Sequence, residues 1–222
     1  MLHPTQELEP PENPARFTSA ALEQLEGIAL LPSGLLALVR EEPSEILLVD
    51  PETGDIRSRR SLKSIDHDNS AWPLFKDDDD DGNKGLEGIA YAPDTDEILA
   101  LKELHPRLLL SLSADLTAVV SVTALSKEMG FDAPSVKDKN TDVSGIAVDR
   151  KRNLLWILSD KGKVIFAFDR SADRAQAIPL TWDGEPVKGA EGIAINQAGD
   201  TMFIVTDDEP KSRFLKFVIR DE

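Results

Sequence analysis

A fourfold repeated motif constrains this chain more than any other feature of its sequence. The repeats are "LEGIALLPSGLLALVREEP" (25–43), "LEGIAYAPDTDEILALKELHP" (86–106), "VSGIAVDRKRNLLWILSD" (143–160) and "AEGIAINQAGDTMFIVTDDEP" (190–210). Each runs from a glutamate or serine through Gly-Ile-Ala and a turn to a second apolar run and an acid. The motif glycines at 27, 88, 145 and 192 are separated by 61, 57 and 47 residues. Periods of roughly 40 to 50 residues with loop insertions are typical of β-propeller blades.

Each repeat contains four short strand-like runs. The third has "SGIAVD", "LLWILSD", "KVIFAFD" and "AQAIPLTW", which are rich in aliphatic and aromatic residues and separated by turn residues. The first two repeats follow the same plan, and the last has three such runs before the printed chain stops. We therefore predict an all-β propeller of four-stranded antiparallel blades, with four repeats counted. An irregular β-sandwich is the alternative, but repetition of the whole hairpin disfavours it.

The last repeat lacks a fourth strand, and an open strand edge promotes aggregation. We predict that "ARFTSAAL" at 15–22 returns as an N-terminal strand that closes this blade. Residues 1–14, rich in proline and acids, are then expected to be a flexible tail, and 15–222 a single propeller domain. Two insertions, 63–85 and 126–141, fall between blades.

Charge and composition exclude several classes of function. The chain has 41 acidic and 25 basic residues and a net charge of −16, so nucleic acid and anionic membranes are not expected partners. It has no cysteine, which excludes disulfides and thiolate chemistry. No apolar stretch of about 18 residues or signal peptide is recognisable. We expect a soluble monomer, cytoplasmic if Met1 is the natural start and extracytoplasmic if a leader precedes it.

The acids of the motif form the candidate site. An antiparallel hairpin brings the start of the first strand of a blade to the end of the second, so Glu26 is expected near Glu41, Glu87 near Glu103, and Glu191 near Asp207. Ser144 is expected opposite Asp160 in the odd blade. We predict that the acids converge on one cation at the mouth of a central channel; they are Glu26, Glu41, Glu87, Glu103, Asp160, Glu191 and Asp207.

Hard oxygen ligands favour Ca²⁺, or less well Mg²⁺. The alternative is that these carboxylates bind strand-end amides of neighbouring blades and hold the blades in register without a metal.

Other candidate features carry weaker signals. "KDDDDDG" at 76–82 lacks the ligand spacing of an EF-hand loop and is interpreted as a solvated acidic loop. His105 is a candidate catalytic base, with a turn residue as the alternative, and Trp72 is a candidate for a binding rim. No serine-hydrolase elbow, phosphate-binding loop or dinucleotide fingerprint is present.

The sequence resembles the SdiA-regulated family of bacterial β-propellers. The segments that carry the resemblance are "GLEGIAYAPDTDEILALKELHP", "DVSGIAVDRKRNLLWILSD" and "GAEGIAINQAGDTMFIVTDDEP". The resemblance covers 85–222 closely and 23–62 more weakly. It implies five blades and no established activity, and it extends faintly to phytase-like and gluconolactonase-type propellers with a divalent ion in the channel. A leading unit and an export segment of the family are missing here.

Two functions follow from these observations. The first is a calcium-binding propeller that binds a small molecule or protein at the channel mouth without catalysis. The second is a metal-dependent hydrolase of phosphate esters or lactones. The fold alone does not choose between them.

Overall fold

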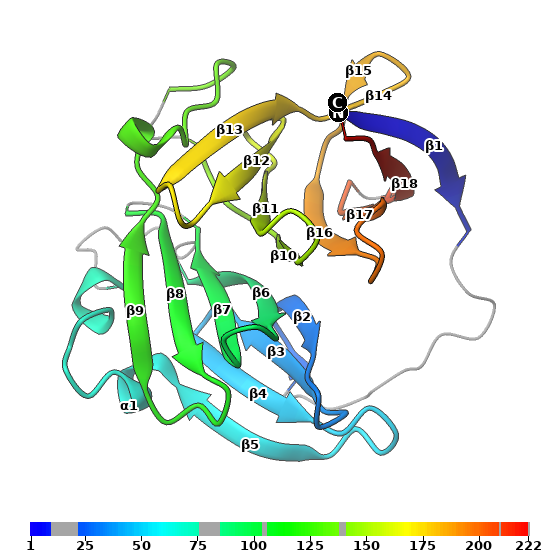
Figure 1. Ribbon diagram of the computed structural model, residues 1–222. Helices are drawn as coiled ribbons and strands as arrows, with labels where there is room; N and C mark the ends of the chain where they lie inside the picture. The colour runs from blue at the N-terminus through cyan, green and yellow to red at the C-terminus, as the bar shows by residue number, and fades with distance from the viewer. Residues whose placement is uncertain (10–21, 76–84, 104–105, 138–140, 209, 222) are drawn as a thin grey trace. The chain divides into compact units, whose positions relative to one another are not determined.

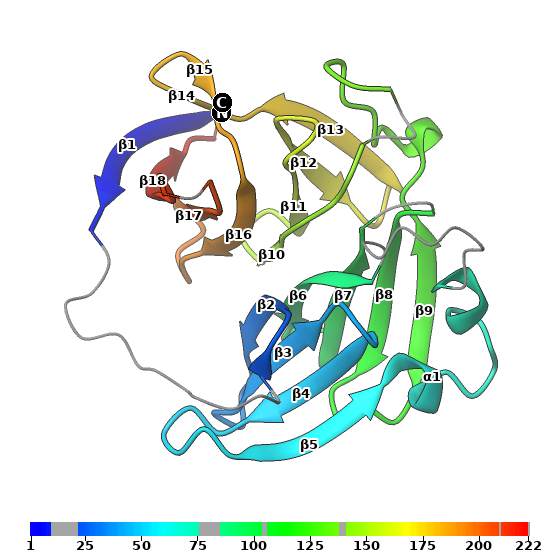
Figure 2. The same ribbon diagram turned by 180° about the vertical axis from the view of Figure 1, so that it is seen from behind.

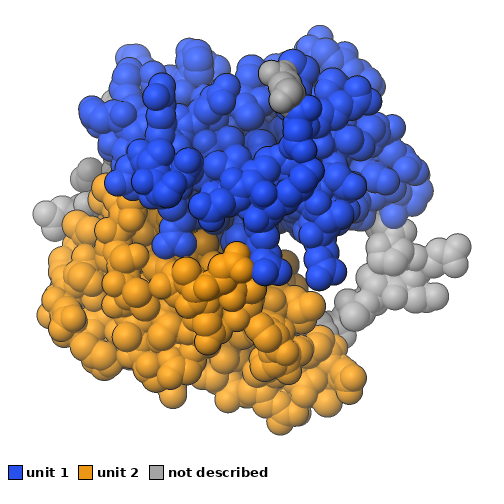
Figure 3. Space-filling view, viewed as in Figure 1, with its two compact units in different colours: residues 1–16, 126–222 blue, residues 17–125 orange. Residues whose placement is uncertain are grey.

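The computed structural model describes residues 1–9, 22–75, 85–103, 106–137, 141–208 and 210–221. These residues form four four-stranded sheets and one two-stranded hairpin, and all strand pairs are antiparallel. The chain divides into two compact units, residues 17–125 and residues 1–16 with 126–222 (Figure 3). Each unit holds two of the four-stranded sheets, which we call blades 1 to 4 in chain order. No helix among the described residues has the length and hydropathy needed to span a membrane.

Blades 1 and 2 make up the unit of residues 17–125 (Figure 1). Blade 1 contains β2 (Leu25–Leu30), β3 (Leu36–Arg40), β4 (Glu45–Val49) and β5 (Ile56–Ser61). Blade 2 contains β6 (Leu86–Ala92), β7 (Glu97–Lys102), β8 (Leu108–Ser113) and β9 (Val119–Ala124). The strands lie in chain order, so the first and the fourth strand form the two edges of each sheet.

Blades 3 and 4 belong to the second unit. Blade 3 contains β10 (Ile146–Asp149), β11 (Leu154–Ser159), β12 (Val164–Asp169) and β13 (Arg174–Pro179). The hairpin of β14 (Thr181–Trp182) and β15 (Glu185–Pro186) follows. Blade 4 contains β16 (Ala190–Ile195), β17 (Thr201–Thr206), β18 (Phe214–Ile219) and β1 (Leu2–Leu8). The predicted strands and the count of four blades are confirmed, and the described residues hold no fifth four-stranded sheet.

The N-terminal closing strand is confirmed, but it comes from other residues than predicted. β1 pairs with β18 from Leu2 opposite Ile219 to Leu8 opposite Phe214 (Figures 1 and 2). The assignment of this strand to 15–22 is therefore wrong, as is a flexible tail that includes residues 2–8; residues 10–21 lie outside the described part. The strand was missed in the sequence because it contains Pro4, next to a register shift. Proline is nevertheless tolerated on an edge strand.

The blades of each unit pack through apolar side chains. One cluster joins blades 1 and 2 and includes Ile46, Ile98 and Leu110, and another joins blades 3 and 4 and includes Leu158, Ile204 and Phe217. Fully burying such a side chain stabilises the fold by about 1.5–3 kcal/mol. The inner strands approach closely: a Cβ atom on Gly27 would lie 2.6 Å from the carbonyl oxygen of Glu87. One on Gly145 would lie 2.6 Å from that of Glu191. Gly27 and Gly145 therefore serve packing between blades.

The insertion after blade 1 begins with α1 (Leu62–Ile65) and the 3₁₀ turn η2 (Trp72–Phe75). Asp66 is buried and accepts hydrogen bonds from the amides of Ala71 (2.9 Å) and Trp72 (2.6 Å). Burial raises the pKa of this carboxyl, but the hydrogen bonds outweigh burial and leave the pKa below its ordinary value. Trp72 packs on the core of blades 1 and 2 and stacks on Phe75, so within the described residues its role is packing.

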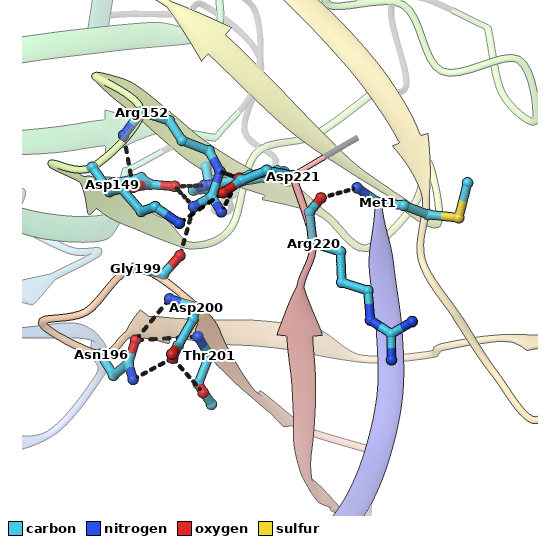
Figure 4. A network of polar contacts seen from close by, with 11 residues as sticks. Met1, Asp149, Arg152, Asn196, Gly199, Asp200, Thr201, Arg220 and Asp221 are labelled. Carbon is cyan, nitrogen blue, oxygen red and sulfur yellow. Dashed lines mark hydrogen bonds and ion pairs between the residues drawn. The ribbon is translucent and has the colours of Figure 1, made fainter.

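A polar network joins the first hairpin turn of blade 3 to that of blade 4 (Figure 4). Arg152 binds buried Asp149 (2.8 Å) and the carbonyl of Gly199 (2.5 Å). Its guanidinium also binds Asp221, which accepts from Lys151 at 2.7 Å. Asp149 further accepts from the indole of Trp156 at 3.1 Å. Charged groups thus reinforce the apolar packing of these two blades.

Removing residues 1–9 should expose the outer edge of β18 and destabilise the unit that contains blades 3 and 4, because β1 supplies the only partner of that edge within the described residues. Thermal unfolding and light scattering measure the effect, which we expect as a lower melting temperature with aggregation. Glu7→Gln removes only the exposed ion pair of β1 with Arg213 and is the control. Equal melting of the truncated and parent proteins would contradict this role of β1.

Candidate metal centre

β-Bulges place the motif glutamates. In blades 1 and 4 the register of the first strand shifts at Glu26 and Glu191, and in blade 2 it shifts between Leu86 and Ile89, which includes Glu87. A bulge reorients a side chain out of the regular alternation, and bulges are frequent beside functional sites. Blade 3 carries Ser144 at this position, where the Ser144 amide donates to Leu158 (3.1 Å) and the Leu158 amide donates to Gly145 (2.8 Å), so Ser144 and Gly145 both oppose Leu158 as in a bulge.

The partner acids follow the second strand of each bulged blade. The amide of Glu41 donates to the carbonyl of Gln24 (3.3 Å). The amide of Glu103 donates to Gly85 (3.4 Å), and that of Asp207 to Gly189 (2.7 Å). In each case the accepting carbonyl belongs to the residue two positions before the motif glutamate. This is the pairing expected for hairpins that bring the paired acids together. The expected closeness of Ser144 and Asp160 in blade 3 stays a prediction.

Three of the seven predicted ligands come together between blades 1 and 2. Glu41, Glu87 and Glu103 each offer a carboxylate oxygen, and these oxygens lie within 4.8 Å of one another. Glu103 is buried, and the other two side chains are half-buried. Burial raises the pKa of Glu41, and the charges of Glu26 and Glu103 raise it further. Burial and the neighbouring carboxylates therefore disfavour the ionised form of Glu41.

The Gly85 amide links Glu41 to the next blade. It donates a hydrogen bond to the Glu41 carboxylate and partly offsets the rise in its pKa. Blade 3 repeats this contact, because the amide of Gly189 donates to Asp160 Oδ1 at 2.5 Å. In both cases the acid after the second strand of one blade binds the amide just before the first strand of the next. Strand-end amides are thus bound by carboxylates, as the alternative interpretation of the sequence expects.

The two junctions differ in their cations. In blade 3, Lys163 lies three residues after Asp160 and binds it at 2.6 Å. Ser44 holds the same place three residues after Glu41, with a matching backbone: φ is 58° at Ser44 and 53° at Lys163. Both amides close the same turn, Ser44 onto Glu41 (2.8 Å) and Lys163 onto Asp160 (3.0 Å). A lysine ammonium therefore neutralises one junction, whereas the equivalent residue of the other carries no charge.

The other four predicted ligands are not among the three glutamates of this cluster. Asp160, Glu191 and Asp207 belong to the unit of blades 3 and 4, whereas the three-glutamate cluster and Glu26 belong to the unit of blades 1 and 2. Convergence of all seven on one ion stays a prediction. His105 and the aspartates at 77–81 lie outside the described residues.

Sequence reasoning missed a buried acid in blade 3. Asp142 accepts from the hydroxyl of Ser159 (2.5 Å) and from the amide of Lys161 (3.0 Å), and so holds the turn that carries Asp160 and Lys163. An acid three residues before the motif glycine, in the repeat that has serine in place of the motif glutamate, was the available signal. Lys102 was also missed: it is fully buried beside Glu103 in the chain, with its Nζ 5.6 Å from the ring centroid of Phe75.

Comparison with known proteins adds family and fold. A family model described as SdiA-regulated matches residues 15–218. Virginiamycin B lyase from Staphylococcus aureus is 14% identical with a TM-score of 0.51, over 88% of this chain and 52% of that chain. Kuenenia stuttgartiensis hydrazine synthase is 12% identical with a TM-score of 0.51, over 92% and 52%. A chain of the mitotic checkpoint complex is 11% identical with a TM-score of 0.50, over 89% and 49%.

The chain thus spans about half the length of these solved chains. No curated protein matches it. At such low identity the similarity to the solved structures supports the fold alone. The fold is an all-β propeller with four-stranded antiparallel blades.

Gly85→Ala should disrupt the cluster, because an added Cβ would overlap the backbone carbonyl and the side chain of Glu41. We expect a loss of at least about 2 kcal/mol in the free energy of unfolding, measured by denaturant titration. Gly34→Ala is the control, since Gly34 has a φ of 83° but nothing within 4 Å of an added Cβ. It should cost only about 1–2 kcal/mol of backbone strain. A Gly85→Ala protein as stable as the Gly34→Ala protein would contradict the close contact.

Proposed function

Since the chain belongs to the SdiA-regulated family, we propose that it is a calcium-binding β-propeller in which Glu41, Glu87 and Glu103 hold the ion and support a non-catalytic site for a small molecule or protein. The observation that carries the proposal is the meeting of three carboxylates from three strand ends within 4.8 Å. Like charges at such distances repel by about 1 kcal/mol per pair even in water, and by more where they are buried. A cation relieves this repulsion.

The donor set favours calcium. All three ligands are carboxylates, and hard oxygen donors are preferred by Ca²⁺ and Mg²⁺. Three glutamates on separate strand ends give an adaptable arrangement, which suits the six to eight ligands of Ca²⁺ better than the strict octahedron of Mg²⁺. Backbone carbonyls and water would complete the shell.

Comparison between the repeats supports the same proposal. Asp160 binds both the Gly189 amide and the Lys163 ammonium, so one junction contains its own cation. Ser44 replaces that lysine beside Glu41, while the junction keeps its acids. A bound metal ion would restore there the charge that Lys163 supplies to the other junction.

Calcium should stabilise the chelator-treated protein. A ligand at 100 times its dissociation constant adds about 2.7 kcal/mol, which corresponds to a rise of about 5–10 °C in melting temperature for a chain of this size. Glu87→Gln and Glu103→Gln should lose most of this rise, whereas Glu185→Gln on the exposed β15 should keep it. Calorimetry and thermal unfolding with calcium, magnesium and no metal provide the measurement.

Ser44→Lys is the sharpest companion variant. If the metal neutralises Glu41 as Lys163 neutralises Asp160, this variant should melt higher than the parent without calcium and respond little to added calcium. The proposal is refuted if the metal-stripped parent binds neither calcium nor magnesium and the glutamine variants are as stable as the parent. Calcium-dependent hydrolysis of a phosphate ester or lactone would instead support the hydrolase function.

Acid titration gives a second test. The pKa of Glu41 is raised in the folded state, so the metal-free protein has a stabilising contribution that is present below the unfolded pKa, about 4.3. This contribution is lost as pH rises through the folded pKa. Glu41→Gln should remove that pH dependence, and calcium should offset the loss above it. Identical stability profiles against pH for the metal-free parent and Glu41→Gln would show that the fold does not raise the pKa of Glu41.

A further inference from the structure

The outer edge of blade 1 is formed by β5, the fourth strand of its sheet (Figures 1 and 2). β5 pairs with β4 on one side, and none of the residues that the structure describes pairs with its other side. Such an edge presents backbone amides and carbonyls that can accept another strand.

β5 is strongly basic in a chain of net charge −16. Arg57 and Arg59 are more exposed than Ile56 and Ser58, and Arg57 lies at a register shift of β5 against β4. The two arginine side chains are 51% and 44% exposed. Arg60 is also exposed, and its guanidinium donates to the carbonyl of Arg59 at 3.3 Å.

Two of the acids that pair with these arginines are less exposed than the arginines, and one is more exposed. Arg59 binds Glu45 at 3.3 Å, and Glu45 is only 14% exposed and also binds Arg40 at 3.1 Å. Arg57 binds Asp50 at 2.7 Å, and Asp50 is 22% exposed, but Arg57 also lies 3.8 Å from Asp55, which is 64% exposed. The positive charge that faces solvent along β5 therefore comes mainly from Arg59 and Arg60.

The outer strands of blades 2 and 3 differ from β5. β9 (Val119–Ala124) contains no charged residue, and β13 (Arg174–Pro179) has one arginine at its first position and a proline at its last. The basic character is thus specific to blade 1 and is not a general property of outer strands in this fold.

Blade 4 shows how an outer edge of this protein binds a distant segment. β1 adds to β18 although the two are about 200 residues apart in the chain. Arg213 of blade 4 donates two hydrogen bonds, of 2.9 and 3.2 Å, to the carboxylate of Glu7 in β1. An extended segment that carries an acid is therefore held by backbone pairing together with an arginine fork.

We propose that the outer edge of β5 binds an extended acidic segment of a partner protein, which adds to blade 1 as a further strand and pairs its carboxylates with Arg57, Arg59 and Arg60. Side chains of a strand alternate between its two faces, so carboxylates at alternate positions of the segment would face Arg59, and carboxylates at the positions between them would face Arg60. Arginine suits this role, since its planar fork binds a carboxylate through two hydrogen bonds.

The competing role for these charges is protection. Charged edge strands, most often with lysine, keep sheets from pairing with each other. A protective edge would reject an added strand, whereas the proposed docking edge selects an acidic one. Binding of a model peptide separates the two roles.

The test uses the full chain and a fluorescent eight-residue peptide with glutamate alternating with threonine and valine. Fluorescence anisotropy should show saturable binding that weakens as salt is raised. The double variant Arg57→Gln/Arg59→Gln should weaken binding about tenfold or more. Arg60→Glu alone should also weaken it, by a smaller factor. Arg174→Glu on β13 is the matched control and should leave the affinity unchanged.

Peptide variants test the strand-like mode. A peptide with lysine in place of glutamate should not bind, and N-methylation of alternate amides should abolish binding of the acidic peptide, because it blocks backbone pairing. Hydrogen exchange of the β5 amides should slow when the peptide is bound. Melting curves of the arginine variants confirm that blade 1 is folded.

Absence of saturable binding, or equal binding by the double glutamine variant, would overturn the proposal in favour of edge protection. Equal binding of the N-methylated peptide, of anionic vesicles or of a single-stranded oligonucleotide would reduce β5 to a non-specific charged surface and would also overturn it. None of these outcomes depends on calcium, so they are independent of the proposed metal site.

Discussion

The hydrogen bond from a backbone amide of one blade to a carboxylate of the preceding blade is the contact on which the rest of the structure depends. Gly85 donates it to Glu41, and Gly189 donates it to Asp160. Beside it, the motif glycine of one inner strand lies against a carbonyl of the next. These contacts fix the positions of neighbouring inner strands, so the apolar clusters between the blades form in a single register. They also bring acids to both of these junctions, which explains why a packing motif is rich in carboxylates.

The two junctions show how one repeat can acquire different chemistry. The same turn, with the same left-handed residue, follows the second strand of blades 1 and 3. Lysine at that residue places an ammonium on Asp160, whereas serine leaves Glu41 beside Glu87 and Glu103. The register role and the metal role of the carboxylates, which compete as interpretations of the sequence, are therefore compatible. Asp160 fulfils the first, and the glutamate cluster adds the features that support the second.

The outer strands diverge more than the inner ones. Inner strands must lie against a neighbouring blade and keep the Gly-Ile-Ala motif, whereas outer strands face solvent and are free to vary. β9 is uncharged, β5 is basic, and blade 4 takes its outer strand from the other end of the chain. This freedom places partner-specific features at the periphery of the blades and leaves the junctions to hold the fold together.

The sequence by itself determined the all-β class, the four blades and the bounds of nearly every strand, because short apolar runs between turn residues are a local signal. It also predicted that the paired acids of a hairpin lie close together, since antiparallel pairing follows from chain order, and Glu87 and Glu103 do so. Only the tertiary structure decided that residues 2–8 rather than 15–22 complete blade 4, because an edge strand needs just one partner and tolerates Pro4. It alone decided that Glu41, Glu87 and Glu103 meet while Asp160 binds Lys163, because these distances depend on bulges and on the packing of one blade against the next.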